Sequence, residues 1–84
     1  MPKVLEQEGF RFIIYPDDHV PSHIHVIKGG EEVVIELGNE NEPPDFRENR
    51  GMRTRDAMRS LEICYELQDH FLSKWRKIHG QEKR

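Results

Sequence analysis

Three of the five histidines of this 84-residue chain lie within seven positions, at His19, His23 and His25. Two carboxylates, Asp17 and Asp18, directly precede the first of them. Imidazole and carboxylate groups bind metal ions and move protons near neutral pH. If the residues from His23 onward form a strand, His23 and His25 point to the same face, because strand side chains alternate. This segment is therefore where chemistry can concentrate.

Metal binding is the first chemistry that this spacing permits. Imidazoles at positions i and i+2 of a strand lie close enough to share an ion, and we predict His19, His23 and His25 as ligands of a divalent metal such as zinc. One of the two aspartates can assist, and Glu36 can be a fourth ligand or orient one of the others. The chain lacks the cysteine pairs and the His-Glu-x-x-His pattern of the commoner zinc sites.

Acid–base catalysis without a metal is a second interpretation, because a carboxylate can orient a histidine as a general base. His23 with Glu36 is the first pair to test, followed by Asp18 with His19. No nucleophile accompanies them, since Cys64 falls on the apolar stripe of a predicted helix and is expected in the core. In a third, structural interpretation, the histidines hold turns and pair with carboxylates across strands. All three interpretations stay open at this point.

Charge is distributed unevenly along the chain, whose net charge is −3. Residues 1–46 hold ten acids and three bases, whereas residues 47–84 hold six acids and ten bases. The net negative charge argues against a general attraction to nucleic acid. Five arginines gather where the second half begins, namely Arg47, Arg50, Arg53, Arg55 and Arg59. We expect them to pair with the acidic half; contact with nucleic acid through them is the alternative.

The length predicts a single domain over residues 1–84. One cysteine permits no internal disulfide, and the first residues, Met-Pro-Lys-Val-Leu-Glu, lack the apolar core of a signal peptide. No stretch approaches the roughly 20 apolar residues of a membrane span. We therefore expect a cytoplasmic protein without membrane association.

Apolar segments rich in β-branched and aromatic residues predict an antiparallel sheet. The expected strands are 10–15, 23–28, 32–37 and a short edge strand at 45–48. Between the second and third of them, Gly29-Gly30 favours a two-residue hairpin turn, because both central residues need positive φ. That turn sets Val26 opposite Val33, so that apolar side chains share one face and the histidines lie on the other.

From residue 55 to about 79, apolar residues recur at spacings of three and four, which predicts one long helix. Its stripe consists of Ala57, Met58, Leu61, Cys64, Tyr65, Gln68, Phe71, Leu72, Trp75 and Ile78. The predicted fold class is therefore α+β, with an antiparallel sheet of three to four strands packed on this single helix in two layers.

Further apolar residues predict a second contact surface. Ile63 and Leu67 widen the apolar arc of the helix, and Ile13, Tyr15 and Val34 fall on the histidine face. Exposed apolar patches usually mark an interface, most simply that of a homodimer. The alternative is that segment 38–52 folds over one of these surfaces.

The segment Asp-His-Val-Pro-Ser-His-Ile-His-Val, residues 18–26, followed by the Gly-Gly turn, resembles the signature of the domain of unknown function 4160 family. The tail agrees: Glu-Asn-Arg-Gly-Met-Arg at 48–53 leads into a helix that ends Phe-Leu-Ser-Lys-Trp-Arg-Lys-Ile-His-Gly at 71–80. Ser22 stands where that signature usually has a second proline. The resemblance implies a small, stand-alone bacterial or archaeal protein, and some members look like partners in toxin–antitoxin-type gene pairs. It supplies no catalytic assignment.

Two classes of function follow. The first is a small binding or regulatory module that acts through a protein partner or self-association, with the histidine cluster structural or ligand-sensing. The second is a small metal-dependent hydrolase of the phosphoesterase or nuclease type, with the three histidines as ligands and Asp17 or Asp18 assisting. The first is favoured, because so short a chain does not easily enclose a deep pocket and no recognised nucleophile or phosphate loop is present.

Overall fold

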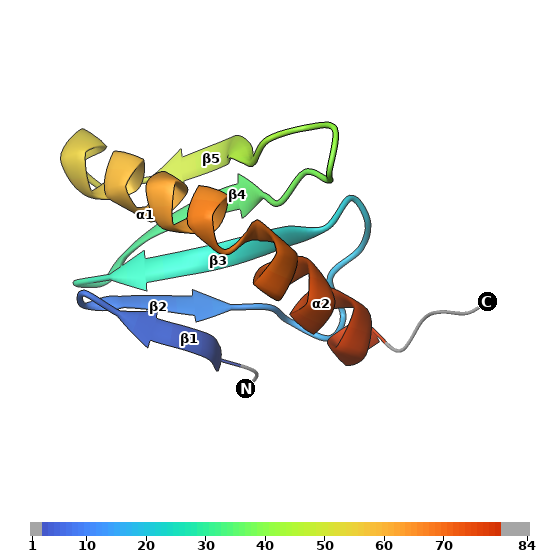
Figure 1. Ribbon diagram of the computed structural model, residues 1–84. Coiled ribbons are helices and arrows are strands. Elements are labelled where there is room, and N and C mark those ends of the chain that lie inside the picture. The colour runs from blue at the N-terminus through green and yellow to red at the C-terminus, as the bar shows by residue number, and fades with distance from the viewer. Residues whose placement is uncertain (1–2, 80–84) are drawn as a thin grey trace.

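The computed structural model describes residues 3–79, which form a sheet covered on one face by helices (Figure 1). Five antiparallel strands lie side by side in chain order: β1 (Lys3–Gln7), β2 (Phe10–Ile13), β3 (His23–Lys28), β4 (Glu31–Glu36) and β5 (Asp45–Arg50). Two helices, α1 (Thr54–Glu66) and α2 (Gln68–His79), run across them. The α+β class and the two-layer arrangement are as predicted. Within residues 3–79 no helix is long and apolar enough to span a membrane.

The β3–β4 hairpin has the predicted register. Val26 lies opposite Val33 and His23 lies opposite Glu36. The two glycines of the turn have φ values of 59° and 83°, which is the left-handed conformation that this turn type requires. Because side chains alternate along both strands, this register separates an apolar face from the face that carries the histidines.

The core lies between the helices and the apolar face of the sheet. Its strand residues are fully buried and include Phe10, Phe12, Ile24, Val26, Val33 and Ile35, and Ile14, which directly follows β2, is buried with them. From α2, Phe71 stacks on Phe12 with ring centroids 5.3 Å apart, and Trp75 is also buried. Each fully buried aliphatic or phenyl side chain contributes about 1.5–3 kcal/mol to stability. The burial of these side chains between helices and sheet holds in place the strands that carry the histidines.

The predicted strands were wrong in two details. A strand that was not predicted, β1, pairs with β2 at the edge of the sheet. It is joined by a tight turn at Glu8 and Gly9, which have φ values of 56° and 82°. The predicted first strand, 10–15, ends at Ile13, because the chain leaves the sheet there and turns at Pro16 and Asp17. The edge strand expected at 45–48 is present and extends to Arg50.

The prediction of a single long helix was also wrong, because the helical segment divides into α1 and α2 at Leu67. This residue has φ −114° and ψ 21°, outside the helical range. The side-chain amide of the next residue, Gln68, lies 2.8–3.0 Å from the backbone carbonyl oxygens of Leu37, Asn39 and Glu42. The division therefore coincides with the point where the helical layer is attached to the loop after β4. Met58 and Tyr65 were expected on the buried stripe, but they are 47% and 54% exposed.

The apolar residues that predicted a second contact surface are largely covered within the chain. Ile63 is buried in the core, and Ile13 and Val34 on the histidine face are buried as well. Segment 38–52 forms β5 and pairs with β4 at the edge of the sheet. The homodimer itself stays a prediction.

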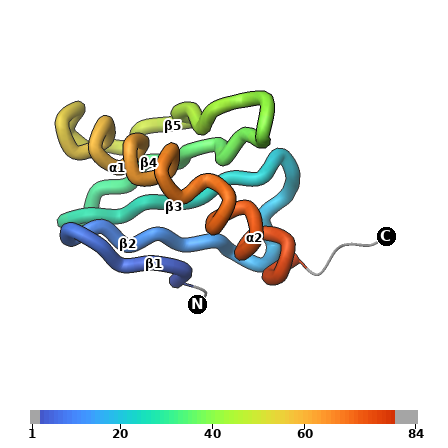
Figure 2. The backbone as a smooth tube through the Cα atoms, viewed as in Figure 1, coloured from blue at the N-terminus to red at the C-terminus, as the bar shows by residue number. Residues whose placement is uncertain are grey.

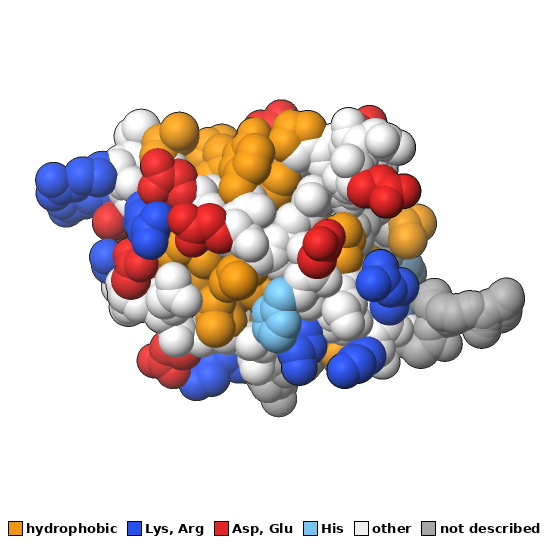
Figure 3. All heavy atoms as spheres, in the orientation of Figure 1, with side chains coloured by type: hydrophobic (Ala, Val, Ile, Leu, Met, Phe, Trp, Pro, Cys, Tyr) orange, Lys and Arg blue, Asp and Glu red, His pale blue; other side chains and the backbone are white. Residues whose placement is uncertain are grey.

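Three of the five clustered arginines pair with acids of the first half, as expected, whereas Arg53 pairs with Asp56 and Arg55 forms no ion pair within residues 3–79. The three ion pairs with the first half are Arg47–Glu36, Arg50–Glu32 and Arg59–Glu8. The Arg59 guanidinium donates two hydrogen bonds to Glu8, at 2.9 and 2.6 Å, and thereby lowers the pKa of that carboxyl. Acidic and basic side chains accordingly mingle over α1 (Figure 3). Contact with nucleic acid through these arginines stays a prediction.

Candidate metal centre

The histidine cluster lies where the loop from β2 re-enters the sheet. His23 is the first residue of β3, and His25 follows two positions later on the same face. Their ring centroids are 5.4 Å apart. From the loop, Asp18 places its Oδ2 atom 3.3 Å from His23 Nε2 and 3.2 Å from His25 Nε2. The predicted side-by-side placement of the two rings is thus confirmed, and an aspartate joins them.

The end of α2 holds the loop that carries Asp18. The backbone N–H of Asp18 donates to the Tyr15 carbonyl oxygen at 3.2 Å, closing a turn. Nε2 of His79, at the end of α2, lies 3.0 Å from the Asp18 carbonyl oxygen. The His79 ring stacks on Trp75 with centroids 3.8 Å apart. Figure 2 shows the same arrangement in the backbone, where the β2–β3 loop passes the end of α2. Asp18 is therefore positioned by the helix as well as by its own loop.

The second nitrogen of each imidazole has an acceptor of its own. His23 Nδ1 lies 2.9 Å from the Pro21 carbonyl oxygen, and His25 Nδ1 lies 2.7 Å from Glu32 Oε2. A backbone carbonyl and an ionised carboxylate can only accept hydrogen bonds, so each Nδ1 carries a hydrogen and donates it. In a neutral ring the other nitrogen then presents a lone pair. Both Nε2 atoms consequently face the Asp18 carboxylate, to which a protonated ring donates a hydrogen bond and a neutral ring presents a lone pair.

Three electron-rich atoms converge in this way: two imidazole nitrogens and one carboxylate oxygen, all within 4.8 Å of one another. Neutral rings in this tautomer repel the carboxylate, and either a proton on Nε2 or a metal cation between the three atoms removes that repulsion. The Oδ2–Nε2 distances of 3.2 and 3.3 Å resemble the ligand–ligand separation of about 3.3 Å that a tetrahedral site has when its metal–ligand bonds are about 2.0–2.1 Å long. Imidazole with carboxylate is also a donor set that suits zinc and neighbouring divalent transition metals. The residues thus fit a metal ion.

The three ligand side chains are mostly sheltered from solvent. Their exposed fractions are 5% for His23, 12% for His25 and 21% for Asp18. The Tyr15 ring packs edge-on against His25 at 4.8 Å, and Trp75 lies beside His23 at 5.4 Å. Electrostatic interactions strengthen where water is partly excluded. Packing on both sides also limits how far either ring can turn away from the centre.

Glu32, the acceptor for His25, is held in turn by an arginine. Arg50 Nη1 lies 3.4 Å from Glu32 Oε2, while the same guanidinium donates to Glu48 at 2.8 and 3.1 Å. The hydrogen bond from Arg50 lowers the pKa of the Glu48 carboxyl. A carboxylate behind a ligand histidine is the usual arrangement around protein-bound metals, because it fixes the tautomer and orientation of the ring.

Sequence reasoning missed Glu32, although a signal for it existed. The predicted register sets His25 opposite Val34, and Glu32 is two residues away on the same strand and face. Such a diagonal neighbour lies within reach of a long side chain.

Three residues considered for the site lie outside the cluster. His19 is exposed and does not belong to the group of ligand atoms found in residues 3–79. Glu36 faces His23 in the register, but its carboxylate lies 3.3 Å from Arg47 Nε. Asp17 is exposed, whereas Asp18, one of the two aspartates considered as a third ligand or an assisting group, lies in the group of atoms that could hold a metal ion. Within the described residues, neither the His23–Glu36 pair nor the Asp18–His19 pair forms a hydrogen bond.

Fold and site together define a small α+β domain in which two histidines and one aspartate face a common point. The family model described as "Domain of unknown function (DUF4160)" matches residues 9–76. The chain belongs to this family, as the histidine motif and the tail predicted. The matched range contains every member of the cluster. No curated protein and no solved structure matches the chain.

Proposed function

We propose that this protein is a small binding module whose Asp18, His23 and His25 side chains hold one divalent transition metal, with zinc as the best fit. The observation that carries the proposal is the engagement of both Nδ1 atoms by acceptors, which turns both Nε2 atoms toward one carboxylate oxygen. These three residues are called the triad below. The bound ion would act as a structural or sensed ligand.

The position of the triad suits such a role. An ion between Asp18 and the two histidines would tie the β2–β3 loop to β3. Because the Asp18 carbonyl also contacts His79, the same link would reach the end of α2. Metal occupancy would then change how firmly the loop and α2 are held together, which is what a protein partner can sense. In the setting that the family resemblance implies, this partner would belong to a toxin–antitoxin-type pair.

A metal-dependent hydrolase is the second candidate. It is favoured by the three-ligand count, which leaves a position open for a water molecule, as in catalytic zinc sites. One observation favours the binding module instead. The hollow bordered by Pro21 and Trp75 has no triad side chain in its wall. Because Cys64 is buried, and burial raises the pKa of its thiol to about 12, a water molecule at the metal would have to be the nucleophile of a hydrolase.

Metal analysis of protein purified without an affinity tag or chelator tests the proposal. We expect close to one zinc per chain in the native protein and in His19→Ala, the matched control from the same segment. Asp18→Ala and His25→Ala should lose the metal while keeping the native circular dichroism spectrum. A folded native protein that takes up no zinc, cobalt, nickel or manganese on dialysis would contradict the proposal, as would equal loss in His19→Ala.

The same preparations separate the two candidates. The binding module predicts no turnover of a chromogenic phosphodiester by the metal-loaded protein. Turnover that a chelator abolishes, and that His25→Ala lacks, would establish the hydrolase instead. Zinc content and turnover are measured on one sample, so loss of the metal and loss of activity can be told apart.

A further inference from the structure

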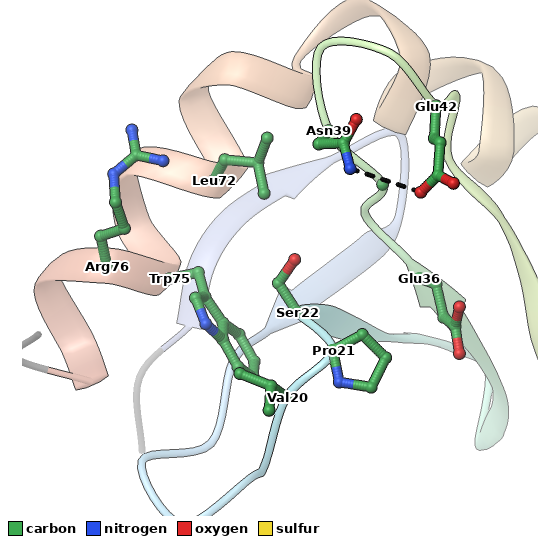
Figure 4. Close-up of a pocket in the computed structure, with 10 residues that line it drawn as sticks. Val20, Pro21, Ser22, Glu36, Asn39, Glu42, Leu72, Trp75 and Arg76 are labelled. Carbon is green, nitrogen blue, oxygen red and sulfur yellow. Dashed lines mark hydrogen bonds between the residues drawn. The ribbon is translucent and has the colours of Figure 1, made fainter. Parts of the chain in front are cut away.

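A hollow of about 390 Å³ lies between α2 and the loops before β3 and after β4, and no triad side chain lines it (Figure 4). Its apolar lining consists of Leu72 and Trp75 from α2 with Val20 and Pro21 from the loop. In Figure 4, Leu72 and Ser22 point toward the space between the helix and the loops. Val20 is 79% exposed, which is more than the two other exposed large hydrophobic residues of segment 3–79, Tyr65 and Met58. An apolar surface is therefore open to an incoming side chain.

The hollow continues along α2 into a second one. Both are lined by Asn39, Leu72 and Arg76, and the second also reaches Glu40 and Asp69. The two together are called the α2 groove below. Because the groove joins two neighbouring hollows along α2, it suits an extended chain better than a single compact ligand.

Acidic side chains dominate the border of the α2 groove. Its carboxylates are Glu36, Glu40, Glu42 and Asp69, against one cation, Arg76. Within residues 3–79, Glu36 pairs with Arg47, whereas neither Glu40 nor Asp69 forms an ion pair. Figure 3 shows the same mixture beside α2, with apolar areas between acidic and basic side chains. The uncompensated charge of the groove is negative, so a cationic occupant is favoured.

The loop wall of the α2 groove is preorganised. Gln68 binds backbone carbonyls of the loop, and Asn39 and Glu42 exchange two backbone hydrogen bonds of 2.9 and 3.1 Å. Gly38 has φ 71°, and a Cβ atom there would lie only 2.3 Å from the Glu42 carbonyl oxygen. The loop is thus closely packed on itself. A wall that needs no ordering lowers the entropic cost of binding.

We propose that the α2 groove binds a short, positively charged peptide segment of a partner protein. An apolar side chain of the segment packs against Leu72 and Trp75, and its lysine or arginine groups face Glu40 and Asp69. The proposal uses the apolar lining and the charge of the groove and does not depend on the metal centre.

Tryptophan emission tests the proposal directly, because Trp75 is the only tryptophan of the chain and lines the groove. The probe is a capped hexapeptide that alternates leucine and arginine, and its match carries glutamate in place of arginine. We expect a saturable change of Trp75 emission with the arginine peptide alone. Its affinity should fall by about tenfold or more at high salt, because exposed charges are screened.

Two double variants test whether the peptide binds in the α2 groove. Replacing both unpaired acids, as Glu40→Gln with Asp69→Asn, should weaken binding by about tenfold, the scale of two exposed charge interactions. The matched control, Glu62→Gln with Glu66→Gln on α1, removes the same charge elsewhere and should leave the affinity unchanged. Equal loss in both pairs, or equal binding of the glutamate peptide, would overturn the proposal. So would emission that depends on protein concentration alone, since the occupant would then be a second copy of the chain.

Discussion

One strand register determines which side chains lie on each face of the β3–β4 hairpin, but the two faces depend on different kinds of contact. On the helix side, Ile24, Val26 and Val33 are buried together and contribute mainly through apolar area, so substitutions that conserve volume are tolerated. On the other side, His25 depends on single atoms: Glu32 Oε2 at 2.7 Å and Asp18 Oδ2 at 3.2 Å. Burial is therefore a collective property of many residues, whereas the centre depends on a few exact partners from different segments.

The largest effect should come from the helix side. Phe71→Ala removes a fully buried ring that stacks on Phe12, and we expect the free energy of unfolding to fall by about 3–5 kcal/mol. Met58→Ala, on an exposed position of α1, should change it by less than about 0.5 kcal/mol. Urea titration followed by circular dichroism measures both. Similar losses in the two variants would show that the core is not where the structure places it.

Metal binding should add stability independently of the core. Zinc at one hundred times its dissociation constant should raise the free energy of unfolding by about 2.7 kcal/mol. The same increment is expected in any core variant that stays folded, such as Ile24→Val, and none in Asp18→Ala. Urea titrations with and without zinc measure the increment. An increment that survives in Asp18→Ala would mean that the ion binds elsewhere.

A smaller effect distinguishes two glutamates on the same strand and face. Glu32→Ala removes the acceptor of His25 Nδ1–H and should weaken zinc binding by about 10–100-fold. Glu36→Ala is the matched control, because that carboxylate pairs with Arg47. Competition with a chromophoric chelator gives both affinities. Equal weakening would show that general negative charge, and not the support of one ring, governs the affinity.

The effect of Cys64 in the core is the smallest at neutral pH and grows only as the pH rises above about 9. Burial raises the pKa of its thiol from 9.0 to about 12, so folding favours the protonated form. The unfolded chain loses that proton first as pH rises, and stability should therefore decline between about pH 9 and 12. A Cys64→Ala variant should lack this part of the decline in urea titrations at several pH values. An identical pH profile in the variant would contradict the assignment.

Periodic features of the molecule were predictable from the sequence. The Gly-Gly turn and the alternation around it gave the hairpin register, the shared face of His23 and His25, and most of the core. Features that do not repeat along the sequence were not predictable. The division at Leu67 interrupts no apolar pattern, and the choice of Asp18 over His19 depends on a loop conformation that contacts with α2 impose. Loops are set by tertiary contacts, which a repeating pattern does not encode.

Imidazole nitrogen resonances test the central claim most directly. In a long-range proton–nitrogen correlation spectrum of the zinc-loaded protein, we predict that His23 and His25 are both protonated at Nδ1, with Nε2 shifted by the metal. His19, on the same loop, should not respond to zinc. A proton on Nε2 of either ring in the presence of zinc, or a response of His19 in its place, would contradict the metal centre described above.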